Sequence, residues 1–204
     1  MKHWAVLAIC GLGTMGCGGD SNLLIVEDPS GLTTPEYSSS VEIVSESGDL
    51  GDQVAALGAT DPTTVPAAGT ANYEGTMIIL TDNPTTSVDP SVAGGLALEI
   101  QFAESAKDTV VRGIADNFFV PSGASVDGTL VVTEARDLSS SGLDISLEGT
   151  LDVEDVDFAY RVDMVQTFSG DGVAALDGLG GATATEVDTG VAQNLVATSA
   201  LVRQ

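Results

Sequence analysis

The sequence is short of positive charge and of aromatic side chains. Its 204 residues include six lysines or arginines against 30 aspartates or glutamates, which gives a formal net charge of -24. Nucleic acid is a polyanion, so this balance argues against it as a partner. One tryptophan, three tyrosines and five phenylalanines are too few for the two aromatic girdles of a membrane-spanning barrel.

Long apolar runs are also missing, apart from one near the start of the chain. Residues 1–16 place a charged beginning before about a dozen apolar or small residues, a pattern typical of a secretory signal and too short to span a bilayer. The following Thr14-Met15-Gly16-Cys17 resembles the lipobox of bacterial lipoproteins. That resemblance implies that Cys17 becomes the lipidated first residue. The next residue is Gly18 and not the aspartate associated with retention at the inner membrane. The alternative is a secreted protein in which Cys17 stays free or pairs with Cys10.

Removal of residues 1–16 would leave the mature protein without histidine, because His3 is the only one. A Ser-His-Asp or Cys-His catalytic unit and a histidine-based zinc or haem site are then excluded. An enzyme would have to rely on carboxylates alone, and no pair of them stands out. We therefore predict a non-enzymatic protein without a cofactor.

Residues 17–69 are rich in Ser, Thr, Pro, Gly, Asp and Glu, and carry no lysine or arginine. This composition predicts an acidic, low-complexity tether, with a coil span of about 40 Å. Short apolar patches such as Val41-Glu42-Ile43-Val44 leave open a short strand or helical turn within it. No stretch after the signal carries the sustained spacing of a long amphipathic helix.

Residues 70–204 read as a succession of strands. The clearest is Leu143–Asp152, in which apolar and polar residues alternate, so that Leu143, Ile145, Leu147 and Leu151 share one face. Eight such candidates are separated by turn signals: 71–82, 95–104, 108–119, 129–135, 143–152, 158–168, 173–187 and 191–202. They predict an all-β fold, an antiparallel eight-stranded up-and-down β-barrel, since closure removes exposed sheet edges. A β-sandwich is the alternative.

Few residues in the predicted barrel suggest a site. Tyr73 and Tyr160 are the candidates for contact residues in a ligand mouth or partner surface, although core packing explains each equally well. The acidic cluster 152–157 has oxygen ligands suited to calcium but lacks the spacing of an EF-hand, which favours a solvated hairpin connection. Arg161 is expected on the polar face of its strand, offsetting nearby carboxylates.

Several short motifs resemble the transferrin-binding protein B-like barrel lipoproteins. They are the lipobox-like segment, the acidic tether, Ala71-Asn72-Tyr73-Glu74-Gly75-Thr76, the Gly-Thr pairs at 128–129 and 149–150, and the glycine-rich 168–181 segment. The resemblance implies an eight-stranded barrel displayed on the outer membrane by a lipid anchor, binding a protein or small ligand. It carries over no binding residue.

Together these patterns predict a lipid-anchored envelope protein whose barrel is a binding module. Its partners would be the membrane, through the lipid, and an unidentified protein or small molecule. The alternative is a periplasm-facing carrier or structural lipoprotein that holds an apolar ligand inside the barrel. The predicted location is the outer membrane, at its cell-surface or its periplasmic face.

Overall fold

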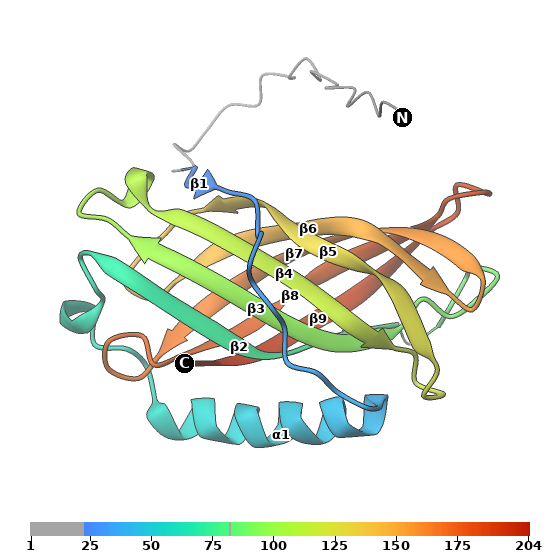
Figure 1. Cartoon of the computed structure of the whole chain (residues 1–204), viewed down its shortest axis with the longest axis horizontal. Coiled ribbons are helices and arrows are strands. Elements are labelled where there is room, and N and C mark those ends of the chain that lie inside the picture. Colours follow the sequence, from blue (N-terminus) through green and yellow to red (C-terminus); the bar gives the residue numbers. More distant parts are fainter. Residues whose placement is uncertain (1–22, 82) are drawn as a thin grey trace, which may run out of the picture.

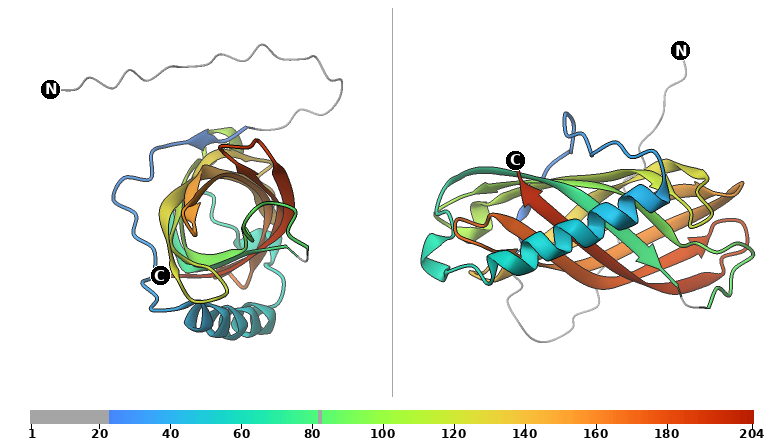
Figure 2. Two further views of the ribbon diagram at one scale, coloured as in Figure 1. Left: turned by 90° about the vertical axis from the view of Figure 1, so that its right-hand side faces the viewer. Right: turned by 90° about the horizontal axis from the view of Figure 1, so that it is seen from below.

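The computed structural model describes residues 23–81 and 83–204, and most of them form one closed β-barrel (Figures 1 and 2). Each of its eight strands pairs antiparallel with the next in sequence, and the last pairs with the first. The strands are β2 (Gly69–Leu80), β3 (Val92–Phe102), β4 (Val110–Phe119), β5 (Ser125–Arg136), β6 (Gly142–Val153), β7 (Val156–Ser169), β8 (Ala175–Glu186) and β9 (Ala192–Arg203). The predicted up-and-down barrel is thus confirmed.

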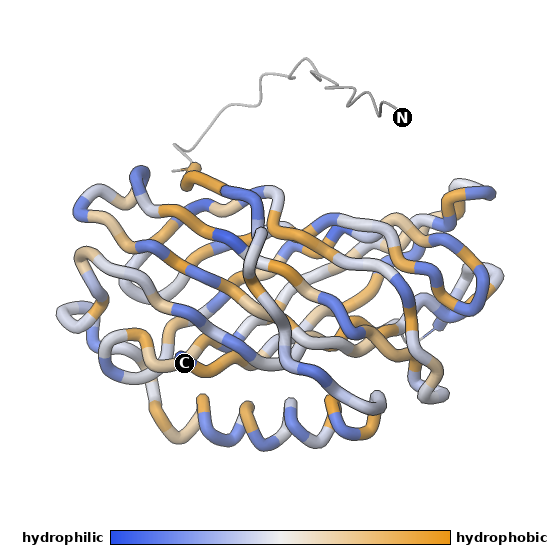
Figure 3. The backbone as a smooth tube through the Cα atoms, viewed as in Figure 1, coloured by the Kyte–Doolittle hydropathy of each residue, from blue (hydrophilic) through white to orange (hydrophobic). Residues whose placement is uncertain are grey.

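Alternation of side chains decides what fills the barrel. Along β6, the predicted inward residues Leu143, Ile145, Leu147 and Leu151 are all buried. Buried and exposed positions alternate in the same way along β7 and along most of β9, and apolar and polar residues alternate along much of the barrel (Figure 3). All eight strands contribute buried apolar side chains to one contiguous hydrophobic cluster, and buried Gln166 donates to the Ser199 hydroxyl beside it. The interior is thus occupied by the protein's own side chains.

The two ends of the barrel differ in their connections. We call the end where β2 begins and β9 finishes the proximal end, on the left of Figure 1; the opposite end, with the β6–β7 turn, is the distal end. The proximal end receives the N-terminal segment at β1 (Ile25–Val26). This strand lies parallel to the start of β4, where β4 and β5 do not pair with each other.

Residues 27–39 form a strap that crosses the outside of the sheet from the proximal to the distal end (Figure 1). The strap leads into α1 (Ser40–Leu57), which returns along the barrel to the proximal end. A short 3₁₀ turn, Pro62–Thr64, then precedes β2, and a second one, Ala106–Asp108, lies between β3 and β4.

The helix α1 differs from the tether expected for residues 17–69. Ser38 and Ser39 begin it with a capping box: the Glu42 backbone N–H donates to Ser39 Oγ, and the Ser38 N–H donates to the Glu42 carboxylate. Only three large apolar side chains, Ile43, Leu50 and Val54, bury against the barrel. Such a sparse stripe, interrupted by glycines, carries no clear helical period in the sequence, so tertiary packing decides the structure here.

No helix in the described part of the chain combines the length and the apolar character needed to cross a membrane.

Packing of α1 on the barrel yields a stability prediction. Ile43 is fully buried beside Ala93 and Phe119, whereas Val41, two residues earlier, is 76% exposed. Ile43→Ala should lower the free energy of unfolding by about 2–4 kcal/mol, because it removes buried methyl groups and leaves a cavity. Val41→Ala is the matched control, with an expected change within about 0.5 kcal/mol. Urea unfolding of both variants measures the difference, and equal small losses would mean that α1 does not pack as described.

Candidate functional site at the acidic distal end

The β6–β7 hairpin at the distal end turns on two acidic residues. Val153 pairs with Val156, and Glu154 and Asp155 between them have φ values of 54° and 64°. Positive φ at both central positions is the geometry of a type I′ turn, which normally uses Asn-Gly. The cluster 152–157 is therefore the hairpin connection that the sequence favoured.

A row of carboxylates crosses three strands beside this turn. Asp152 on β6 pairs with Asp127 on β5 on one side and with Asp157 on β7 on the other. All three side chains are exposed, as are Glu154 and Asp155. None of these five forms an ion pair with another described residue. Like charges directly opposite each other destabilise a sheet, so this row costs stability.

Carboxylates in the middle of the same sheet are compensated instead. Arg161 on β7 pairs with Glu148 across the ladder at 2.5 Å and with Asp163 at 3.2 Å, as expected for its polar face. Partial burial opposes ionisation of Asp163, but hydrogen bonds from Ser146 and Arg161 prevail and lower its pKa. Arg136 likewise contacts Glu134 and Asp144. Carboxylates without an ion pair among the described residues also lie elsewhere, for example Glu46, Asp49 and Asp52 on α1. What sets the distal end apart is that its carboxylates lie directly opposite each other on adjacent strands.

Two adjoining clefts open beside the carboxylate row. The larger, of about 600 Å³, lies between the strap, β4 and β5, and the smaller, of about 200 Å³, between β5 and the β6–β7 turn. Both are lined by Ser125 and Asp127. The other carboxylates that line them are Glu36, Asp116, Asp152, Glu154 and Asp155, and no lysine or arginine lines either cleft. We call the five exposed carboxylates and these two clefts the acidic face.

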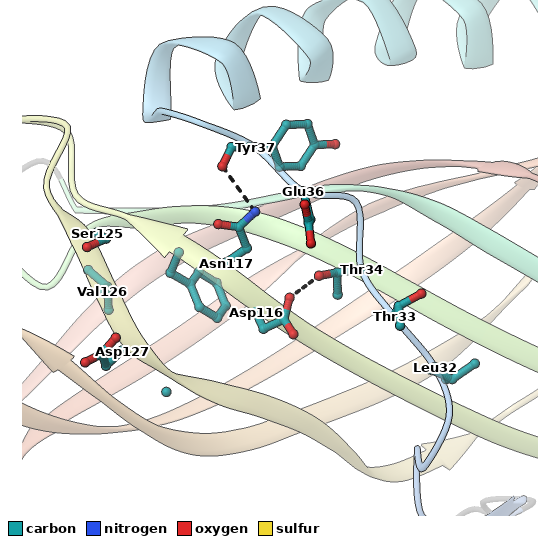
Figure 4. A pocket seen from close by; sticks show the side chains of 12 residues that line it. Leu32, Thr33, Thr34, Glu36, Tyr37, Asp116, Asn117, Ser125, Val126 and Asp127 are labelled. Carbon is teal, nitrogen blue, oxygen red and sulfur yellow. Dashed lines mark hydrogen bonds between the residues drawn. The ribbon is translucent and has the colours of Figure 1, made fainter.

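A bulge in β4 creates the larger cleft. Pairing with β5 stops after Ala115 and resumes at Phe118, and Asn117 between them has a φ of 54°. The Asn117 side-chain amide donates to the backbone carbonyl of Tyr37 at 3.3 Å, and the Thr34 hydroxyl donates to Asp116 (Figure 4). These bonds hold the strap over the opening.

The strap also depends on a glycine in the sheet beneath it. A Cβ atom on Gly95 of β3 would lie 2.8 Å from the Pro35 carbonyl oxygen, which is closer than real Cβ atoms approach. Glycine at this position lets the strap lie directly on the barrel wall.

The described residues offer little for catalysis or metal binding. They include neither histidine nor cysteine, since His3, Cys10 and Cys17 precede residue 23. In this part of the chain, no group of three or more His, Cys, Asp or Glu side chains is arranged to hold a metal ion. What the acidic face can do is attract positive charge.

Tyr73 and Tyr160, the predicted contact residues, both point into the barrel. Their exposed fractions are 0% and 3%, so neither side chain lies on the outer surface. The Tyr73 hydroxyl donates to the Val173 carbonyl in the β7–β8 connection at 2.9 Å, and the Tyr160 hydroxyl donates to the Pro90 carbonyl in the β2–β3 connection. Burial raises the pKa of Tyr73 to about 12 and raises that of Tyr160 as well. The two side chains fasten loops at opposite ends of the barrel.

The sequence indicates only part of the acidic face, the cluster 152–157. Asp127 lies 25 residues before Asp152 and joins the row only through the β5–β6 register, which no local pattern predicts. The predicted lipidation site, Cys17, lies outside the described residues.

The positive φ values of Glu154 and Asp155 predict that the β6–β7 turn lowers the stability of the protein. Replacing Glu154-Asp155 by Asn-Gly should raise the free energy of unfolding by about 1 kcal/mol, because these residues adopt positive φ with little strain. The control Glu154→Gln/Asp155→Ser removes the same charges but keeps residues that disfavour positive φ. Equal stabilisation of the two variants in urea unfolding would assign the gain to charge repulsion and contradict the turn explanation.

Comparisons of the chain with models of protein families, with curated proteins and with solved structures found no match. The resemblance to transferrin-binding protein B-like lipoproteins therefore stays a prediction drawn from short motifs.

Proposed function

We propose that this protein is a lipid-anchored bacterial envelope protein whose barrel binds a basic macromolecular partner through the acidic face. The observation that carries the proposal is the uncompensated row Asp127–Asp152–Asp157, next to Glu154 and Asp155. Repulsion within this row destabilises the free protein and is relieved when a cationic surface approaches.

The rest of the barrel supports a binding role over the alternatives. An apolar cargo would need space inside the barrel, but the inward side chains already form one contacting cluster. This disfavours the carrier hypothesis. An enzyme would have to work without histidine or cysteine, because residues 23–204 contain neither. A transferrin-binding protein-like role, with a protein partner at the outer membrane, agrees with an exposed charged face but rests on the motif resemblance alone.

The anchor has a direct genetic test. Cys17→Ser, made with residues 1–16 replaced by an ordinary cleavable secretory signal, removes the only thiol of the mature chain to which lipid can attach, so the protein should move from the membrane fraction to the soluble fraction. Mass spectrometry of the wild-type protein should show an acylated N-terminal cysteine. An unmodified thiol on membrane-free wild-type protein would contradict the anchor.

The acidic face is tested by charge removal at constant shape. The variant Asp152→Asn/Glu154→Gln/Asp155→Asn should bind a lysine-rich peptide about tenfold more weakly than the wild type, at roughly 0.5 kcal/mol per charge. Binding of the wild type should weaken as salt rises, since surface attraction is screened. Isothermal titration calorimetry at several salt concentrations measures both effects.

The matched control removes three charges elsewhere. Glu46, Asp49 and Asp52 lie exposed on α1, so Glu46→Gln/Asp49→Asn/Asp52→Asn gives the same change in net charge. This control should retain most of the wild-type affinity. Equal losses in the two triple variants would show that net charge alone attracts the peptide and would exclude a specific acidic face.

A further inference from the structure

The point where the chain joins the barrel is fixed at the proximal end. Leu24 is buried in the core cluster, and its backbone N–H donates to the Ala135 carbonyl of β5 at 2.9 Å. The next N–H, of Ile25, donates to the Thr109 carbonyl just before β4 at 3.1 Å, and Leu23 bridges to Arg136. The chain is thus held on both sides from residue 23 onward, in the gap between β4 and β5.

Little chain separates this point from the proposed lipid anchor. Six residue steps lead from Cys17 to Leu23, and at 3.3–3.6 Å per residue they span at most about 20 Å. The 12-residue strands, at ~3.3 Å per residue and a tilt of about 40°, make the barrel roughly 30 Å long. A tether shorter than the barrel itself restricts which end can approach the bilayer.

The apolar and charged side chains at the two ends of the barrel also favour the approach of the proximal end to the bilayer. Leu23 and Ile25, at the entry point, are 60% and 45% exposed, and apolar residues at such a position can contact a lipid interface. Lys107, Arg136 and Arg203 all lie at the proximal end, whereas the described residues of the distal connections include no lysine or arginine. An anionic lipid surface therefore repels the distal end more strongly than the proximal end.

We infer that the proximal end of the barrel faces the phospholipid surface, with Leu23 and Ile25 at the interface, and that the acidic face points away from it. This inference rests on the proposed lipid anchor at Cys17. On a long tether the barrel would sample every orientation relative to the membrane. With the short connection to Leu23, the barrel is instead held close to the membrane in one orientation. The acidic face is then the part of the molecule best placed to meet a partner.

The orientation is measurable by short-range energy transfer to lipid. Ser140 lies in the proximal β5–β6 connection and Ser122 in the distal β4–β5 connection, and both are exposed. Ser140→Cys and Ser122→Cys, made in the full lipidated protein, each add one free thiol for a fluorophore, because acylated Cys17 does not react. The labelled proteins are reconstituted into phosphatidylethanolamine–phosphatidylglycerol vesicles that carry a headgroup-linked acceptor. Transfer should be severalfold more efficient from position 140 than from position 122.

A longer tether provides the control. A Gly-Ser insert of about 20 residues between Asn22 and Leu23 adds a coil span of about 25 Å and should bring the two efficiencies together. Equal transfer from both positions without the insert, or stronger transfer from position 122, would overturn the orientation while leaving the anchor intact. Failure of the protein to acquire lipid, seen by mass spectrometry before labelling, would overturn the proposed anchor and the orientation with it.

Discussion

Closure of the sheet is the constraint on which the rest of this structure depends. Because β2 pairs with β9 as well as with β3, every residue of the eight strands must point either into a shared interior or outward. Apolar side chains take most of the interior, and most charged side chains of the strands lie on the outer wall, where register decides their neighbours; Glu186 of β8 is buried instead. Arg161 thereby meets Glu148, whereas Asp152 meets two further aspartates.

The barrel is incompletely hydrogen-bonded between β4 and β5, and the N-terminal segment covers this part of the wall. β4 and β5 share only four paired positions, interrupted by the bulge at Asp116 and Asn117. At the proximal end β1 occupies the gap between the two strands, and further along the strap crosses the bulge. The segment that precedes the barrel is therefore part of its wall, which shortens the free chain available to any anchor and exposes the acidic cleft only between the strap and β5.

Structure could be predicted from the sequence where apolar and polar residues alternate along a strand. It could not be predicted where residues far apart in the sequence come into contact. All eight strands were recognisable, since alternation such as that of Leu143, Ile145 and Leu147 is a local signal. The helix α1 was missed, because Ile43, Leu50 and Val54 form a helical stripe only against the outer wall of the barrel. The carboxylate row was seen in part, since no local pattern brings Asp127 to Asp152. The two tyrosines could not be placed, because the sequence does not tell a core hydroxyl bonded to a loop carbonyl from an exposed one.

Carboxylates directly opposite each other on adjacent strands distinguish the distal end from the rest of the barrel, and we propose that they serve binding. NMR titration of ¹⁵N-labelled protein with a lysine-rich peptide tests that claim most directly, because it locates the contact without altering the protein. We expect saturable shifts of the amide signals of residues 127 and 152–157 and of the strap beside them, with α1 and the proximal connections unaffected. Shifts spread evenly over the acidic surface, or concentrated on α1, would contradict it.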